Sequence, residues 1–260
     1  MNEDLKNCCA TLYESDFARL LLGDSFHPGG LRLTQQLGEL LDLSPGLRVL
    51  DVASGKGESA IFLARHFGCE VVGIDFGSEN VKESGARAAA ARVGQLAQFR
   101  QGDAEKIDFQ NAEFDAVICE CAFCTFADKP AAASEIARVL KPGGRVGLSD
   151  LTRSTGLAPE LEGLLAWIAC IADARPAAEY AAYLDAAGFT GLNVEPHDEA
   201  LAEMVREIQG KLLGAELMSR LRKLDIEGVD FTQAKALARA AADAVRLRTL
   251  GYAIVTGRRG

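Results

Sequence analysis

The sequence predicts an α/β fold in which helices are wound on both faces of a seven-stranded, mostly parallel sheet. Two observations carry this prediction. From about residue 45 onward, short apolar runs alternate with segments of helical periodicity, the pattern of a parallel sheet with right-handed crossovers. The chain also has 260 residues and is 48% hydrophobic, which is enough to bury one large core.

We expect a single domain over residues 1–260, because no internal repeat or low-complexity linker divides the chain. It comprises an N-terminal helical cover (1–44), a core that carries the ligand motifs (45–150) and a helical insertion (198–248) before the last strand. Strands are expected at 47–52, 69–75, 96–101, 114–120, 145–150, 189–195 and 251–256. Helices are expected at 8–22, 31–43, 57–67, 78–93, 129–140, 158–173 and 176–187.

The first two helices follow from apolar spacings near 3.6 residues, with a glycine-rich loop at 23–30 between them. Residues 44–46, Ser-Pro-Gly, end the second helix ahead of the first strand. The insertion is rich in Ala and Leu and has charged outer faces. It fits a lid, a dimer surface or extra cover for the core.

The stretch 49–60 combines a buried strand with a glycine-rich turn that opens a helix. Residues 47–52 alternate too little for a half-exposed strand, so we expect both faces of this strand to be buried. Gly55 and Gly57 allow a sharp turn and a close approach of the backbone to a ligand, where a Cβ atom would clash. The helix that starts at Ser59 directs its free N–H groups toward that ligand.

Acidic residues at neighbouring strand ends narrow the choice of ligand. The glycine spacing also fits a dinucleotide loop, and Asp75, about 20 residues on, suits the ribose of a nicotinamide or an adenosyl cofactor. Asp51, however, lies directly before the turn, where its carboxylate can face an amino group and would repel a pyrophosphate. Residues 102–104, Gly-Asp-Ala, follow the third strand, and residues 139–144, Val-Leu-Lys-Pro-Gly-Gly, precede the fifth.

In this order and spacing, residues 45–150 resemble the class I S-adenosylmethionine-dependent methyltransferases. The resemblance implies S-adenosyl-L-methionine as cofactor, an antiparallel last strand and an N-terminal segment that folds over the cofactor. A nicotinamide-dependent dehydrogenase is disfavoured, because its loop would rarely start about 50 residues into the chain and no hydride-transfer constellation is found. The residues that the resemblance assigns to the cofactor are Asp51, Ala53, Ser54, Gly55, Gly57, Asp75, Phe76, Asp103, Ala104, Glu120 and Tyr13.

Within this set, the resemblance implies separate roles. Asp75 would bind the ribose, Asp51 the amino group, and Asp103 with Ala104 the adenine edge. Gly55 and Gly57 would border the methionine part of S-adenosylmethionine.

Composition limits the partners. A net charge of −9 and a pI near 5.0 disfavour nucleic acid and anionic membranes, which attract clustered Lys and Arg. The longest apolar stretch, 164–172, is too short to cross a bilayer, and residues 1–6 lack a signal-peptide pattern. We therefore expect a cytoplasmic enzyme, in a compartment that keeps thiols reduced. The seven cysteines then need an explanation other than structural disulfides.

Three cysteines surround the expected end of the fourth strand. Cys119, Cys121 and Cys124 are placed at or beside the carboxyl end of the sheet, where methyl acceptors bind in this class. As strand residues, Cys119 and Cys121 would share one face. A structural zinc site is a rival explanation, but no second Cys-x-x-Cys pair supplies four ligands. Cys69 opens the second strand and is expected to be a core residue.

Further cysteines make the resemblance more specific. Cys170 lies in the helical region after the fifth strand, and Cys8 and Cys9 lie in the N-terminal segment. Cysteines in these places resemble those of the arsenite methyltransferases: Cys121 matches the family's Asn-Cys-Val cysteine and Cys170 its Cys-Val/Ile-x-Gly-Ala cysteine. The departures are Glu120 and Ala122 beside Cys121, Asp173 for the glycine, and the adjacent pair at 8 and 9.

This resemblance implies that Cys121 and Cys170 hold a trivalent metalloid, most simply arsenite, with Cys9 or Cys8 as third ligand or redox partner. Soft thiolates select soft centres, and a bound arsenic atom keeps a lone pair that can attack a sulfonium methyl without a general base. The substrate would be a small inorganic or organometalloid species. A dithiol reductant, glutathione or a thioredoxin-like protein, would reopen any relay disulfide.

Several alternatives stay open. Mercury, antimony, selenium or tellurium species would suit the same thiols. A small-molecule O-, N- or C-methyltransferase with incidental cysteines would instead need a base, for which His27, Glu120 and Asp150 are candidates. A metalloid-sequestering protein would bind without turnover. The oligomeric state is not indicated by the sequence.

Overall fold

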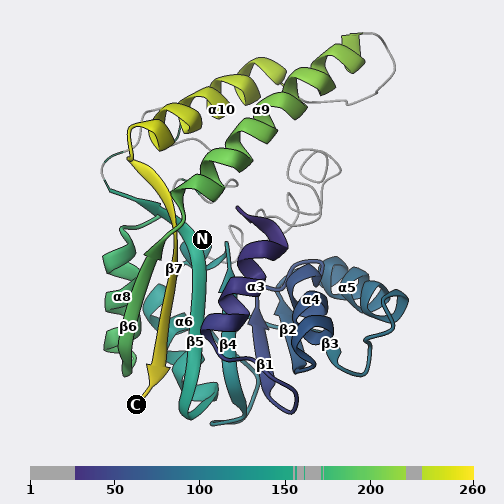
Figure 1. Ribbon diagram of the computed structural model, residues 1–260, viewed down its shortest axis with the longest axis vertical. Coiled ribbons are helices and arrows are strands. Elements are labelled where there is room, and N and C mark those ends of the chain that lie inside the picture. The colour runs from purple at the N-terminus through teal and green to yellow at the C-terminus, as the bar shows by residue number, and fades with distance from the viewer. Residues whose placement is uncertain (1–26, 155, 157–160, 162–170, 172, 221–229) are drawn as a thin grey trace.

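The structure is a computed structural model that describes residues 27–154, 156, 161, 171, 173–220 and 230–260 (Figure 1). Its centre is a seven-stranded sheet in the order β3-β2-β1-β4-β5-β7-β6. The strands are β1 (Arg48–Val52), β2 (Glu70–Asp75), β3 (Ala97–Gln101), β4 (Phe114–Glu120), β5 (Leu140–Arg153), β6 (Phe189–Pro196) and β7 (Leu250–Arg259). The helices are α3 (Gly30–Leu40), α4 (Glu58–Phe67), α5 (Ser78–Ala90), η1 (Phe123–Thr125), α6 (Lys129–Val139), α8 (Ala177–Ala186), α9 (Asp198–Arg220) and α10 (Phe231–Arg246).

The strand directions agree with the predicted fold. β1 pairs in parallel with β2 and β4, β2 with β3, and β4 with β5. β7 lies between β5 and β6 and is antiparallel to both, as the resemblance implied. The carboxyl ends of β1, β2, β4 and β5 therefore meet at one edge of the sheet, where the predicted motif residues lie.

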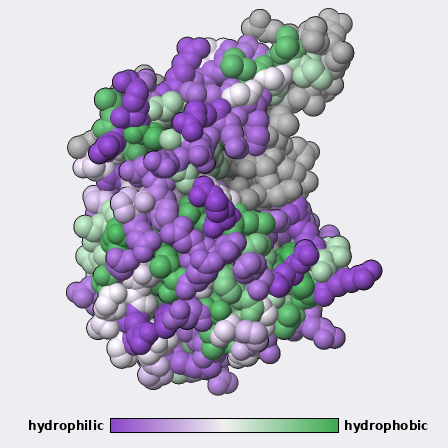
Figure 2. Space-filling model, viewed as in Figure 1, coloured by the Kyte–Doolittle hydropathy of each residue, from purple (hydrophilic) through white to green (hydrophobic). Residues whose placement is uncertain are grey.

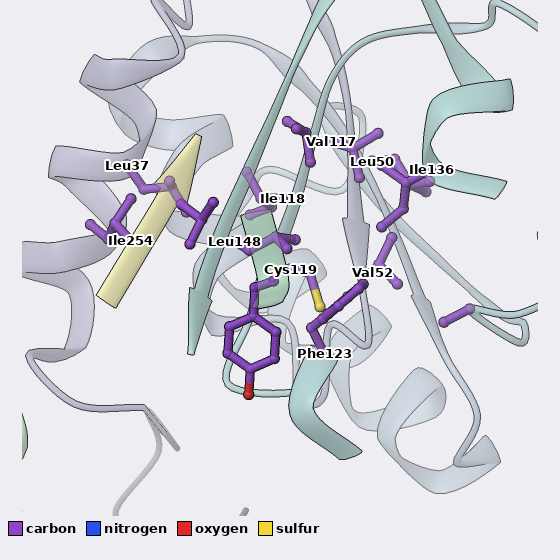
Figure 3. Packing of buried hydrophobic residues seen from close by; sticks show 14 of the residues in the cluster. Leu37, Leu50, Val52, Val117, Ile118, Cys119, Phe123, Ile136, Leu148 and Ile254 are labelled. Carbon is purple, nitrogen blue, oxygen red and sulfur yellow. The ribbon is translucent and has the colours of Figure 1, made fainter. Parts of the chain in front are cut away.

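One continuous apolar core fills the space between the sheet and its helices (Figure 3). The helix α3 packs closely on β5, because Gly147 has no side chain: a Cβ atom there would lie 2.5 Å from Leu37 Cδ1. Leu37 is fully buried, as are Leu50 and Ile118 of the two neighbouring central strands. The central strands are thus buried on both faces, as their continuous apolar runs predicted.

The insertion consists of two antiparallel helices. Figure 1 shows α9 and α10 side by side, extending beyond the end of the sheet. Their contact buries Leu212, Ala234 and Ala238. Figure 2 shows a face on which hydrophilic and hydrophobic residues are interspersed, and α9 leaves Leu213 and Leu217 60% and 58% exposed. A lid or dimer role for this pair of helices stays a prediction.

Two local expectations were wrong. The fifth strand was expected at 145–150 but extends from 140 to 153, because the Lys-Pro-Gly-Gly stretch forms an irregularity at which the register with β4 shifts. Cys119 and Cys121 were expected on one face of a strand. β4 ends at Glu120, however, and Cys121 adopts a left-handed backbone with a φ of 53°, which takes it out of the strand.

Other expectations lie outside the described residues. They are the helices at 8–22 and 158–173 and, among the site residues, Cys8, Cys9, Tyr13 and Cys170. Within the described part of the chain, no helix is both long and apolar enough to span a membrane.

Candidate active site

The glycine-rich turn after β1 combines tight packing with open space. The Gly57 backbone has a φ of 78°, and a Cβ atom there would lie 2.6 Å from the Phe99 ring. Gly55 also has a positive φ, 51°, but a Cβ atom there would meet nothing within 4 Å. Gly57 is therefore required by packing, whereas Gly55 borders space that a ligand can occupy.

Asp75, at the end of β2, organises this turn. One of its carboxylate oxygens accepts the Gly55 N–H at 2.8 Å, and the other accepts the Gly77 N–H at 2.9 Å and the Asn80 side chain at 3.1 Å. Burial raises the pKa of Asp75, while these hydrogen bonds lower it. The carboxylate thus links the turn to the start of α5, at the position where the sequence predicted a ribose ligand.

Asp51, at the end of β1, is 2% exposed. Its Oδ2 atom has no hydrogen-bond partner among the described residues. Burial raises the pKa of Asp51 well above its usual range, and the negative charges of Glu120 and Asp75 raise it further. A buried carboxylate with a vacant acceptor position among other carboxylates favours a cationic ligand. The ammonium group of a methionine moiety meets this requirement.

The remaining predicted cofactor residues line the same edge of the sheet. Ala53 and Ser54 begin the turn, and the Ser54 N–H bonds to the Ile74 carbonyl at 2.9 Å. Asp103 follows β3 and accepts the Glu105 N–H at 2.9 Å. Three more are close to strand ends: Phe76 directly after β2, Ala104 after β3 and Glu120 at the end of β4.

The carboxylate of Glu120 lies in a chain of buried polar side chains, of which only Glu120 and His27 were predicted from the sequence. The Thr34 hydroxyl on α3 donates to its two oxygens, at 3.0 and 3.3 Å, and the Ser149 hydroxyl on β5 donates at 3.3 Å. The Tyr252 hydroxyl on β7 donates to the Ser149 hydroxyl at 3.1 Å. His27 Nε2 lies 3.8 Å from Glu120 Oε2.

Cys121 follows Glu120 directly, where the strand ends. Its N–H donates to the Ser149 carbonyl at 2.7 Å, and the residue is half-buried. Burial raises the pKa of Tyr252 well above its usual range, and the nearby charges of Cys121 and Glu120 raise it further. The tyrosine hydroxyl therefore stays protonated at neutral pH and can donate to Ser149.

The other described cysteines are buried: Cys69, Cys119 and Cys124 each have no exposed surface. Burial, followed by the charge of Asp150, raises the pKa of Cys119 well above its usual range. Such a thiol is inert at neutral pH. In the part of the chain that the structure describes, no group of three or more His, Cys, Asp or Glu side chains could hold a metal ion.

Asp150, a candidate base, is 2% exposed and already bonded. Its carboxylate accepts the N–H groups of Cys124 at 2.9 Å and Leu151 at 2.7 Å. These bonds hold η1 against the end of β5, which gives Asp150 a structural function.

Comparison with known families decides the class. Residues 50–148 match the family model described as a methyltransferase domain. The chain contains a methyltransferase domain, and the sheet around it has the Rossmann-like methyltransferase fold. S-adenosylmethionine is the cofactor of this domain, in agreement with the vacant acceptor at Asp51 and the open space at Gly55.

Among the proteins similar to this chain are enzymes that are considerably longer than the region they share with it. Phosphoethanolamine N-methyltransferase of Triticum aestivum is 30% identical over 173 residues, which are 66% of this chain and 30% of the wheat protein. The structure of Haemonchus contortus phosphoethanolamine N-methyltransferase 2 with phosphomonomethylethanolamine and S-adenosylhomocysteine has a TM-score of 0.83 and 17% identity, covering 98% of this chain and 60% of that one. The chain thus matches about a third of the length of the wheat protein.

The cyclopropane synthase MmaA2 of Mycobacterium tuberculosis has a TM-score of 0.81 and 17% identity, with 98% of both chains covered. These structures share the fold of the methyltransferase domain. Their names describe different reactions, so the acceptor of this chain has to be inferred from its own residues.

Proposed function

We propose that the chain transfers a methyl group from S-adenosylmethionine to a soft, thiol-binding centre held at Cys121, with arsenite as the first substrate to test. One observation carries this proposal. Of the cysteines that the structure describes, Cys121 alone is partly exposed, and it lies at the strand end next to Glu120, whose charge acts on Asp51 in the cofactor site.

S-adenosylmethionine supplies an electrophilic methyl group on a positively charged sulfur. Asp51 would bind its amino group through the vacant Oδ2 acceptor, Asp75 its ribose, and Asp103 with Ala104 its adenine. The buried carboxylates of the site favour the positive charge of the donor.

A thiol-bound acceptor also accounts for the state of the candidate bases. Glu120 and Asp150 already accept hydrogen bonds from protein groups. A soft atom with a lone pair needs no proton removed from it, so such an acceptor is consistent with described carboxylates beside Cys121 that already accept hydrogen bonds. Cys170, with Cys9 or Cys8, would complete the thiol set, and glutathione or a thioredoxin-like protein would serve as reductant.

The test is an S-adenosylhomocysteine assay with purified protein, glutathione and separate acceptors: arsenite, methylarsenite, mercuric ion, selenite and phosphoethanolamine. We expect turnover with arsenite, loss of that turnover in Cys121→Ser and Cys170→Ser, and retention in the buried control Cys69→Ala. Turnover of Cys121→Ser at the wild-type rate would refute the proposal. Arsenite binding without S-adenosylhomocysteine would identify a sequestering protein.

A second candidate is methylation of a small amine. It is favoured by the concentration of negative charge at the strand ends, where Asp150, Asp51 and Glu120 all act on the Cys119 thiol. The name of the wheat relative describes an amine acceptor. In this case phosphoethanolamine, or another amine, would be methylated, Cys121→Ser would keep its activity and Glu120→Gln would lose it.

A further inference from the structure

The helix α3 is held to the sheet by two kinds of contact. Leu37 packs on the bare backbone of Gly147. Apolar packing of this kind is non-directional and tolerates small rotations or shifts of the helix. The Thr34 hydroxyl, fully buried, donates to Glu120, and a hydrogen bond constrains both distance and direction. Two directional bonds therefore set the orientation of α3 at this end of the sheet: the Thr34 hydroxyl donates to Glu120, and the Gln36 amide donates to Glu195 on β6 at 3.4 Å.

Burying the Glu120 carboxylate at this position costs desolvation free energy. The side chain is 4% exposed, and its hydroxyl partners Thr34 and Ser149 are fully buried. An apolar side chain of similar size would avoid the cost of removing a carboxylate from water, so stability alone does not explain the glutamate. A requirement for one specific arrangement of α3, β4 and β5 does explain it.

The same arrangement fixes the backbone at Cys121. Ser149 donates its hydroxyl to Glu120 and accepts the N–H of Cys121 with its carbonyl, at 2.7 Å. Cys121 itself has a left-handed φ of 53°, a backbone conformation that costs free energy unless the surroundings enforce it. Ser149 of β5 thus holds both Glu120, the last residue of β4, and Cys121 directly after it. The Tyr252 hydroxyl donates to Ser149 in turn.

We propose that Glu120 is a positioning residue: its hydrogen bonds to Thr34 and Ser149 hold α3 and the turn at Cys121 in the one arrangement that presents Cys121 to the acceptor. The identity of that acceptor rests on the proposed function. The positioning of the Cys121 side chain does not, because it can be measured without an acceptor.

Thr34 offers the sharpest test, because its variants remove or keep one hydrogen bond and leave the Glu120 side chain itself in place. Thr34→Val has nearly the same shape but no donor, Thr34→Ser keeps the donor, and Thr190→Val, on the exposed β6, is the matched control. Three quantities are measured for each variant: the rate at which iodoacetamide alkylates Cys121, followed by peptide-resolved mass spectrometry, the Kd for S-adenosylmethionine, and kcat and KM for arsenite with glutathione.

We expect Thr34→Val to change the alkylation rate of Cys121 and to lower kcat/KM for the acceptor by roughly 10- to 100-fold, with the Kd for S-adenosylmethionine unchanged. Thr34→Ser should restore both rates. Wild-type rates in Thr34→Val would overturn the proposal, as would losses that Thr34→Ser does not restore or that are matched by an equal loss of cofactor binding. If the wild-type protein methylates no arsenite, the function proposed above fails, while the alkylation rates still decide whether Glu120 and Thr34 position Cys121.

Discussion

Two regions at the carboxyl edge of the sheet are built differently: the proposed cofactor end, after β1 and β2, and the proposed acceptor end, at β4 and β5. Around the cofactor, backbone groups and glycines dominate: Asp75 binds the N–H groups of Gly55 and Gly77, and Gly57 packs on Phe99. At the acceptor end, side-chain hydroxyls from α3, β5 and β7 surround the carboxylate of Glu120. The first end is assembled mainly by short segments of chain, the second by residues far apart in the sequence.

This difference separates donor binding, which proteins of this fold can share, from acceptor binding, which can differ between them. The fold is shared with proteins whose names describe different reactions, so a backbone cradle suits the constant part of a methyl transfer, which is the donor. Side chains on separate elements can change one at a time, so the acceptor end is where specificity can vary. The four predictions below test this division, in order of decreasing effect.

Gly57→Ala should cause the largest loss of stability. The added Cβ atom would lie 2.6 Å from the Phe99 ring, in a backbone conformation with a φ of 78°. Left-handed strain and overpacking together predict a loss of about 3 kcal/mol in the free energy of unfolding, measured by urea denaturation.

Gly55→Ala is the matched control for this substitution. It carries the same kind of strain but meets no atom within 4 Å, so we expect a loss of about 1 kcal/mol. Its Cβ atom should nevertheless weaken binding of S-adenosylmethionine, because it enters the space assigned to the donor. Equal stability of the two variants would contradict the packing role of Gly57.

Asp51→Asn should weaken S-adenosylmethionine binding by about 10- to 100-fold, measured by calorimetry, because it removes a charged hydrogen-bond acceptor. Without the cofactor, the variant should be more stable than the wild type at neutral pH. The folded-state pKa of Asp51 is raised by burial, so the unfolded chain releases its proton first as the pH rises from about 4.

The free energy of unfolding of the wild type should accordingly fall as the pH increases from about 4 toward the raised pKa, and Asp51→Asn should remove this part of the decline. Thermal unfolding of both proteins between about pH 4 and 8 measures the difference. A steeper pH dependence in the variant would contradict the assignment.

Tyr252→Phe should cost about 1 kcal/mol, because it removes the donor to the buried Ser149 hydroxyl, and should leave S-adenosylmethionine affinity unchanged. Tyr183→Phe is the control: its hydroxyl bonds to Glu179 within α8, at 2.5 Å and only part-buried, so we expect a smaller loss. A loss of cofactor binding in Tyr252→Phe would mean that the two ends are not separable.

Arg32→Ala should have the smallest effect. Arg32 on α3 lies 3.8 Å from Glu203 on α9, and the two side chains are 72% and 57% exposed. An ion pair so exposed contributes at most about 0.5 kcal/mol, and less at high salt. A larger change in the unfolding free energy at low salt would show that α3 depends on the α9–α10 pair.

The contrast between a cofactor end built from short segments and an acceptor end built from distant residues also explains what the sequence could predict. The strands, the glycine turn and the two acids Asp51 and Asp75 follow from local patterns, and the structure has them where they were expected, apart from the greater length of β5. Thr34, Ser149 and Tyr252 were missed, because a polar residue in a buried element finds its partner only through tertiary packing. One signal was available: Ser149, a polar residue inside an apolar strand, required a buried hydrogen-bond partner.

The expectation that Cys119 and Cys121 share a face failed for a related reason. It held only if the strand continued one residue beyond its expected end at 120, and the residue types at 120–122 do not reveal where the backbone turns left-handed. The contributions of Cys170, Cys8 and Cys9 stay predictions, since they lie outside the described residues.

The place of β7 in the sheet has a consequence for biosynthesis. β6 pairs with β7 alone among the described strands, and β7 is translated after all the others. A nascent chain that has emerged from the ribosome as far as α10 can already assemble the parallel strands and the donor pocket, but β6 must wait unpaired. Tyr252 arrives with the same strand, so the hydrogen-bonded chain from Tyr252 through Ser149 to Glu120 is completed last.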